Sequence, residues 1–179
     1  MATKYLKMPN DESSSSSSSS SILIQVSETL PSLESVHDFL SSSSPGCGAV
    51  SVFVGITRNN FEGKVVTNLE YEGYTPMAIR ELHAICCDAR AMYPGVERLV
   101  AAHLLGDCPV GGASVVVGCN SPHRKEAMRC TEYLIDELKA RVPIWKKEIY
   151  EGDEGSVWKE NLEWREGRRR RVMAKENHV

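Results

Sequence analysis

Residues 120–148 of this 179-residue chain are rich in basic side chains, and five of them have the types and spacing of a binding site. They stand at the two ends of the segment: His123, Arg124, Lys139, Lys146 and Lys147. The segment lacks the closely spaced pairs of Cys or His that bind metal ions. Cationic groups at this density instead favour an anionic substrate. The sequence therefore predicts an anion-binding site in this segment, with the rest of the chain as the frame that holds it.

Lys139 is the lysine of the predicted second long helix that leans towards its core side. On a helical wheel it falls at the edge of an apolar stripe. The stripe is formed by Ala127, Met128, Thr131, Leu134, Ile135, Leu138 and Val142. Partial burial disfavours a charged ammonium, which makes a lysine usable as a nucleophile or proton shuttle. The spacing fits equally well a lysine whose stem covers apolar surface while its ammonium stays in water.

The segment ends in a predicted strand, Ile144–Tyr150. Strand alternation places Lys146 and Glu148 on one face and Lys147, among apolar residues, on the other. A lysine on an apolar face is expected beside a pocket or a partner. The alternative for this charged run is a solvated edge strand that its charges protect from aggregation.

The start of the second long helix supplies the other cations. Ser121 is predicted as its N-cap and Pro122 as its first residue, which puts His123 and Arg124 in the first turn. Backbone amides and the helix dipole favour an anion there, so a phosphate is expected. Arg58, just past a strand end, could give a guanidinium fork to the same phosphate. An ordinary first-turn histidine and an ordinary loop arginine remain the alternatives.

Hydrophobic patterns predict the elements that position these residues. Strands are expected at residues 22–26, 49–56, 65–71, 97–105, 113–119 and 144–150, and helices at 33–40, at 75–93 and from 122 to just before Pro143. We expect the strands at 49–56 and 65–71 to pair antiparallel, a loop at 106–112, and Thr75 to cap the first long helix. The strand at 113–119 is nearly all apolar, hence central. The order predicts an α+β fold with helices packed on a mostly antiparallel sheet.

One domain is expected at residues 22–164, between two tails. Residues 1–21 carry a serine run and are expected to be disordered. They lack Arg and contain Asp11 and Glu12, unlike a transit peptide. Residues 156–164 could close the fold, and residues 165–179 form a basic tail that includes the run 168–171.

Composition excludes several classes of protein. The net charge of −3 is unlike that of a dedicated nucleic-acid binder. No apolar run approaches the ~18 residues of a membrane span. Without C-x-x-C spacing or a signal peptide, the 6 cysteines are expected to be reduced thiols of a cytosolic protein. Cys119 and His123 lack a second ligand pair for zinc, so no metal site is predicted.

Four motifs make the sequence similar to the catalytic, large subunits of molybdopterin synthase in their eukaryotic form. They are FVGITRN at 53–59, LEYEGY at 69–74, SPHRKEA at 121–127 and LKARVPIWKKE at 138–148. The resemblance covers residues 22–164, and the last two motifs together are specific. Neither tail belongs to it.

The resemblance implies an α/β hammerhead-like fold and a homodimer of large subunits within a heterotetramer. Each large subunit is expected to bind a small ubiquitin-like sulfur-carrier subunit whose C-terminal Gly-Gly bears a thiocarboxylate. The implied reaction moves two sulfurs onto cyclic pyranopterin monophosphate, which forms the dithiolene of molybdopterin during molybdenum cofactor biosynthesis. No metal or other cofactor is implied for this subunit.

Residue roles follow from the same resemblance. The family's two catalytic lysines match Lys139 and Lys146. Its substrate-binding positions match His123, Arg124, Arg58, Lys147, Glu148 and Phe53.

Two other functions remain open on the sequence. A non-catalytic module that binds ubiquitin-like Gly-Gly tails would keep its activity when Lys139 and Lys146 are replaced by Ala. An RNA-associated domain using the run 168–171 would show salt-dependent RNA binding that is lost with residues 165–179. The acidic balance and the lack of interleaved aromatic residues count against RNA.

Overall fold

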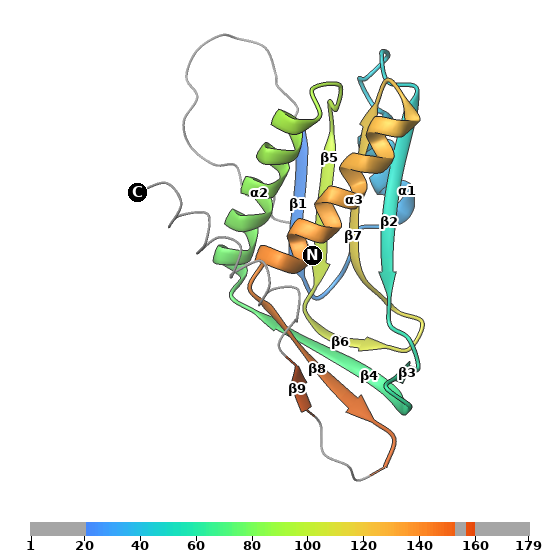
Figure 1. The fold of residues 1–179 in the computed structure, drawn as a ribbon, viewed down its shortest axis with the longest axis vertical. Helices are drawn as coiled ribbons and strands as arrows, with labels where there is room; N and C mark the ends of the chain where they lie inside the picture. The colour runs from blue at the N-terminus through green and yellow to red at the C-terminus, as the bar shows by residue number, and fades with distance from the viewer. Residues whose placement is uncertain (1–20, 153–156, 160–179) are drawn as a thin grey trace.

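A computed structural model describes residues 21–152 and 157–159 of the chain, which form two sheets and three helices (Figure 1). The helices are α1 (Leu33–Ser41), α2 (Thr75–Met92) and α3 (Arg124–Arg141). The strands are β1 (Ile22–Ser27), β2 (Ala49–Ile56), β3 (Asn60–Phe61), β4 (Lys64–Gly73), β5 (Leu99–Leu104), β6 (Gly106–Pro109), β7 (Ala113–Ser121), β8 (Ile144–Tyr150) and β9 (Val157–Lys159).

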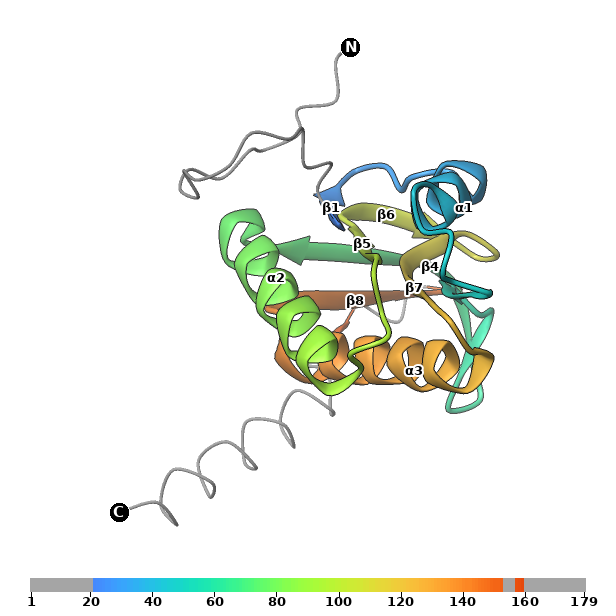
Figure 2. The same ribbon diagram turned by 90° about the horizontal axis from the view of Figure 1, so that it is seen from above.

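The first sheet has the strand order β1-β5-β7-β2, and only its β1–β5 pair is parallel. Helix α1 covers one face, while α2 and α3 cover the other (Figure 2). β5 is buried along its whole length, and β7 from its second residue onward. The predicted central position of the strand at 113–119 is therefore confirmed.

The second sheet is antiparallel and lies across one end of the first (Figure 1). Its strand order is β3-β4-β8-β9, with β6 paired to β4 as well. A small apolar cluster that includes Leu69 and Leu104 joins the two sheets. The expected α+β fold, with helices on a mostly antiparallel sheet, is confirmed.

Two expectations about the strands are wrong. The strands at 49–56 and 65–71 do not pair, because β2 pairs with β7 whereas β4 pairs with β6 and β8. The chain leaves the first sheet at Thr57, whose N–H donates to the Gly112 carbonyl at 2.9 Å and whose carbonyl accepts from Gly111 N–H at 2.9 Å. The expected loop at 106–112 likewise contains β6.

Both long helices begin differently from the prediction. Thr75 is the first residue of α2 rather than its cap, and Tyr74 is the N-cap. Ser121 is the last residue of β7, and α3 begins at Arg124 with His123 as its N-cap. Ser121 does not cap α3 because its hydroxyl donates to Glu126 at 2.5 Å. The expected end before Pro143 is confirmed.

The predicted serine-rich and basic tails lie outside the described residues, except that Ser21 accepts a hydrogen bond from Arg90 at 2.9 Å. Of the expected closing segment, the described part is β9. All 6 cysteines are free, which confirms the prediction of thiols. No helix within the described ranges combines the length and apolar content that a bilayer crossing requires.

Candidate active site

The junction of α3 and β8 carries the two candidate catalytic lysines. Lys139 lies in the last turn of α3, and Lys146 is the third residue of β8. Arg141 fixes the junction to α2, donating to Glu81 at 2.6 Å and to Asp88 at 2.7 Å. Lys139 is exposed, which contradicts a partly buried ammonium and agrees with the alternative of a lysine whose stem covers apolar surface. A large anionic substrate can therefore reach this side chain.

Lys146 is held between an acid and an aromatic ring. Its Nζ lies 3.0 Å from Oε1 of Glu148 and 5.8 Å from the centre of the Phe61 ring. Its side chain keeps 35% of its surface exposed. The lysine therefore has a defined position while it stays accessible from solution.

Glu148 is the buried member of this group. Its side chain is 2% exposed, and Oε2 accepts a hydrogen bond from the hydroxyl of Tyr150. A buried carboxylate is destabilising unless it is paired, and here both oxygens have partners. Since β8 also lies between β4 and β9, the alternative of a solvated edge strand is wrong. The predicted shared face of Lys146 and Glu148 is confirmed.

Lys147 points to the opposite face of β8. Its Nζ lies 3.1 Å from Oε2 of Glu70, its cross-strand neighbour on β4. About a quarter of the side chain is exposed, at 25%. The two consecutive lysines therefore serve different faces of the second sheet.

Arg58 and Phe53 come from β2 and the residues that follow it. Thr57 is buried and anchors the backbone to the turn at 111–112, so Arg58 projects into solvent from a fixed point. Phe53 lies on the side of the sheet that α3 covers, because Val54 packs into the α1 cluster. Both side chains are exposed.

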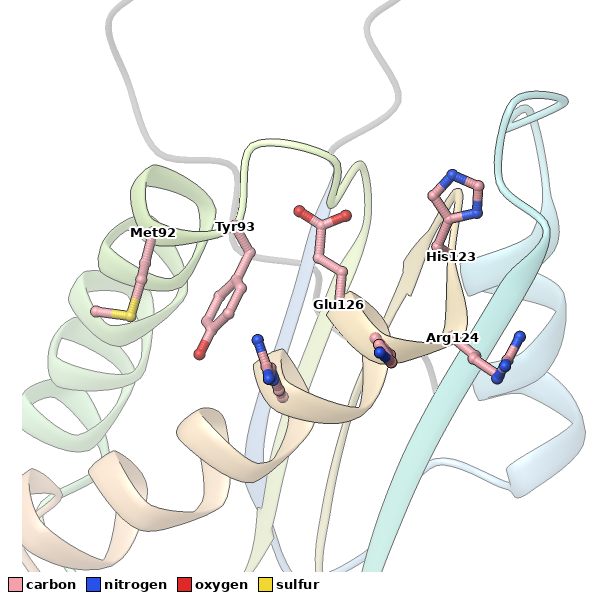
Figure 3. Close-up of a pocket in the computed structure, with 7 residues that line it drawn as sticks. Met92, Tyr93, His123, Arg124 and Glu126 are labelled. Carbon is pink, nitrogen blue, oxygen red and sulfur yellow. The ribbon is translucent and has the colours of Figure 1, made fainter.

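His123 and Arg124 begin α3 at the other end of the first sheet. They line an open pocket of about 610 Å³ between the end of α2 and the start of α3, with Lys125, Arg129, Glu126, Tyr93 and Met92. Figure 3 shows Arg124 directed to the side of the helix opposite Tyr93. His123 makes no side-chain capping bond, so its imidazole does not occupy the anion position at the first-turn amides.

The candidate residues therefore form two groups within one chain. One group, with Lys139 and Lys146, lies at the α3–β8 junction, and the other, with His123 and Arg124, lies at the start of α3. Arg124 and Lys139 are 15 residues apart on α3, about 22 Å at an α-helical rise of ~1.5 Å per residue. Arg58 follows the end of β2, whereas His123 and Arg124 follow Ser121, which pairs with the first residue of β2. One chain does not bring Arg58, His123 and Arg124 to one phosphate.

Sequence reasoning missed Phe61, Tyr150 and Thr57 as residues that position the site. The alternation of β8 places Tyr150 beside Glu148, a signal that was available. Phe61 reaches Lys146 only through the β3–β4 hairpin, which local patterns do not reveal. Across the described part of the chain, no three His, Cys, Asp or Glu side chains gather as a metal ion would require.

Known proteins resemble this chain in sequence. The family model described as MoaE protein matches residues 26–141. The chain belongs to the MoaE family. It is 57% identical over 119 residues to a molybdopterin synthase catalytic subunit of Drosophila willistoni, covering 66% of this chain and 32% of that protein. It is 57% identical over 120 residues to one of Taeniopygia guttata, covering 67% of this chain and 76% of that protein.

Solved structures share the fold of this chain. The crystal structure of molybdopterin synthase from Staphylococcus aureus matches with a TM-score of 0.70 at 35% identity, over 76% of this chain and 96% of that one. A complex of subunits 1 and 2 of molybdopterin-converting factor from Helicobacter pylori matches with a TM-score of 0.61 at 24% identity, over 80% and 92%. The chain spans about a third of the length of its Drosophila relatives, 32% in the first case.

Proposed function

We propose that this chain is the catalytic subunit of a molybdopterin synthase. It transfers sulfur from the C-terminal thiocarboxylate of a small ubiquitin-like subunit to cyclic pyranopterin monophosphate, which forms the molybdopterin dithiolene. Membership of the MoaE family and the names of the relatives support this proposal. The structural observation that carries it is the pair of accessible lysines, Lys139 and Lys146, on the two sides of the α3–β8 junction.

The two lysines have different tasks in this reaction. Lys139, exposed at the end of α3, orients the thiocarboxylate and activates its carbon. Lys146 stabilises the anionic intermediates as sulfur attacks the side chain of the pterin. Both the tail and the cyclic phosphate are anions, so cations at the α3–β8 junction, with Arg58, match their charge.

The small subunit binds where its Gly-Gly tail can reach Lys139 and Lys146. The Helicobacter pylori relative, solved as a complex of two different subunits, is consistent with such a partner. The 6 free thiols are typical of the cytosol, where we place the reaction.

A second copy of the chain completes the site. Among the described strands, β2 pairs with β7 on one side and leaves its other edge open. That edge carries exposed apolar residues, with Ile56 58% exposed, and native proteins cover such edges. Met128, expected in the apolar stripe of α3, is 63% exposed and lies one turn before Thr131, which bonds to β2. We place the homodimer contact of the heterotetramer at this edge.

Two-fold pairing of β2 with its copy joins the two groups of cations. Identical edge strands related by a two-fold axis run antiparallel, so the start of one β2 lies beside the end of the other. The strand spans about 26 Å for its 8 residues, similar to the helical separation of the groups. The partner subunit's His123 and the partner subunit's Arg124 then come beside Arg58, where they bind the phosphate of the substrate.

Reconstitution tests the proposed function. The purified chain is mixed with thiocarboxylated small subunit and cyclic pyranopterin monophosphate, and the dithiolene is measured. The wild type should form it, and Lys139→Ala should abolish it while small-subunit binding stays nearly unchanged. No product when both partners bind overturns the enzyme assignment. Normal turnover by Lys139→Ala and Lys146→Ala would instead identify a module that only binds Gly-Gly tails.

A further inference from the structure

Tyr150 ends a chain of side-chain contacts that begins at Lys146. Its hydroxyl donates to Oε2 of Glu148, and Oε1 of the same carboxylate lies 3.0 Å from Nζ of Lys146. The two oxygens of Glu148 are thus engaged by two different neighbours. All three residues share one face of β8, at every second position.

The carboxylate and the ammonium group differ in how deeply they are buried. The carboxylate of Glu148 lies inside the second sheet at 2% exposure, whereas the Lys146 side chain reaches the surface. A buried carboxylate has little freedom to exchange its partners for water, so each hydrogen bond constrains the other. Because Tyr150 holds Oε2, the orientation of Oε1 is set, and with it the place of the ammonium group.

Tyr150 is itself firmly placed. Its ring packs against the cluster that contains Val66 and Leu69, and Nζ of Lys64 lies 5.4 Å from the ring centre. Position 150 is also the end of β8 that pairs with Val66 of β4. The hydroxyl is therefore presented by a side chain that is packed and whose backbone is paired with β4.

We propose that Tyr150 is a positioning residue, which acts through Glu148 to fix the ammonium group of Lys146 for the reaction. The assignment rests on the proposed catalytic role of Lys146. The buried carboxylate of Glu148 then links the hydroxyl of Tyr150 to the ammonium group of Lys146. A catalytic cation held in place before substrate arrives needs no reorganisation during the reaction.

Kinetics of Tyr150→Phe test this role, since the variant removes only the hydroxyl. We expect kcat for dithiolene formation to fall roughly tenfold, the size of losing one hydrogen bond to a charged group, while KM for the pterin is unchanged. Tyr133→Phe is the matched control, because this partly buried tyrosine packs against Tyr93 on the helical side of the molecule. It should keep wild-type kcat. A Tyr150→Phe variant with wild-type kcat, or with KM raised instead, overturns the proposal.

A double variant separates positioning from general stability. If Tyr150 acts only through Glu148, adding Tyr150→Phe to Glu148→Gln should cause almost no further loss of kcat. Losses that multiply would show that the hydroxyl acts by another route and would contradict the proposal.

Amine labelling tests the contact without using activity. With an amine-reactive ester and mass spectrometry, Lys146 of Tyr150→Phe should react severalfold faster than in the wild type. Lys147, paired with Glu70 on the other face, is the internal control and should react at an unchanged rate. Equal labelling of Lys146 in both proteins refutes the positioning role. If the wild type forms no dithiolene, the proposed function is refuted but the positioning role is not, because the labelling rate of Lys146 still tests its contact with Glu148.

Discussion

His103 is an ionisable side chain of β5 enclosed where the two sheets meet. It is 7% exposed and packs edge to face on Tyr71 of β4, with ring centroids 5.0 Å apart. Its Nδ1 lies 2.7 Å from the carbonyl oxygen of Leu104. Burial lowers the pKa of His103 to about 4, against a weaker opposing effect of that backbone bond. The imidazole is therefore neutral in the folded protein at physiological pH.

Because the pKa of His103 is lowered in the folded protein, we expect the protein to lose stability in mild acid. The unfolded chain binds a proton at position 103 near pH 6.5, whereas the folded chain does so only near pH 4. The stabilisation is complete above about pH 6.5 and is lost as the pH falls towards about 4, by up to about 3 kcal/mol. Urea unfolding of wild type and His103→Asn at several pH values measures it. The variant should show the smaller change with pH.

His37→Asn is the control for that experiment, because this imidazole is 66% exposed. It should retain the wild-type dependence on pH. A His103→Asn protein whose stability follows pH as steeply as the wild type would contradict the prediction.

Single residues were predictable where the argument needed only a local period. The alternation of β8 placed Lys146 with Glu148 and apart from Lys147, as the ion pairs to Glu148 and Glu70 confirm. The exposure of Lys139 was not predictable, because it depends on what the end of α3 packs against. The burial of Glu148 likewise depends on tertiary pairing, because β8 lies between β9 and β4, and Leu69 of β4 comes from a distant part of the chain.

At the scale of elements, Glu126 joins three segments at the start of α3. Its Oε1 accepts from the N–H of Gly95 at 3.1 Å, and its Oε2 accepts from Ser121 at 2.5 Å. The loop after α2 and the end of β7 are thereby held to the first turn of α3. A Cβ added at Gly95 would lie 2.3 Å from Oε2 of Glu126.

Gly95→Ala should therefore destabilise the protein by displacing Glu126 from both of its hydrogen bonds. We expect a loss of about 1–3 kcal/mol in the free energy of unfolding, similar to that of Glu126→Ala. In the Glu126→Ala background the same glycine substitution should cost almost nothing, because the displaced side chain is gone. Denaturant unfolding of the four proteins in this cycle measures the coupling. Additive losses would show that the alanine strains the loop itself.

Elements were predicted better than their pairings. The strands Ala49–Ile56 and Ile144–Tyr150 match the expected ranges, because alternation and β-branched content are properties of the segment itself. The predicted partner of β2 was wrong because two strands that are neighbours in the sequence need not pair when the chain passes from one sheet to the other between them. The N-caps predicted for α2 and α3 were wrong, since Tyr74 and His123 stand at those positions and the Ser121 hydroxyl donates to Glu126 instead.

At the scale of the whole molecule, an active site divided between subunits predicts complementation. Arg124→Ala and Lys139→Ala should each be inactive alone. If Arg124 serves the partner's lysines, a dimer of the two variants holds one intact site, and random mixing should restore about a quarter of wild-type activity. The two proteins are co-refolded, and dithiolene formation is measured. Activity that stays at background would place all the functional groups of a site on one chain.

If a homodimer forms through the open edge of β2, a charge placed on that edge should break it. Val52→Lys places a charge at the middle of an exposed apolar strand, which should convert the dimer to a monomer without unfolding it. Sedimentation measures the mass, and Val65→Lys, at an exposed position of β4, is the control that should remain dimeric. A dimeric Val52→Lys protein would move the homodimer contact elsewhere.

The order of the predicted elements indicated the α+β fold, and the basic motifs predicted a cationic site, but neither predicted how the cations are arranged in space. His123 and Arg124 are close in sequence to Lys139, Lys146 and Lys147, yet the 18-residue helix α3 separates the two sets in space. The proposed union of these groups through a second copy depends on the surface of the folded chain, which periodic patterns in the sequence do not describe.

The opposite orientation of Lys146 and Lys147 limits how the length of this region can change during evolution. Removing or inserting one residue between Pro143 and Lys146 would turn each side chain of β8 to the other face. Lys147 would then face inward, and Lys146, the proposed catalytic residue, would be directed towards Glu70. Substitutions along β8 can accumulate one at a time, whereas a change of one codon in its length would disable the site in a single step.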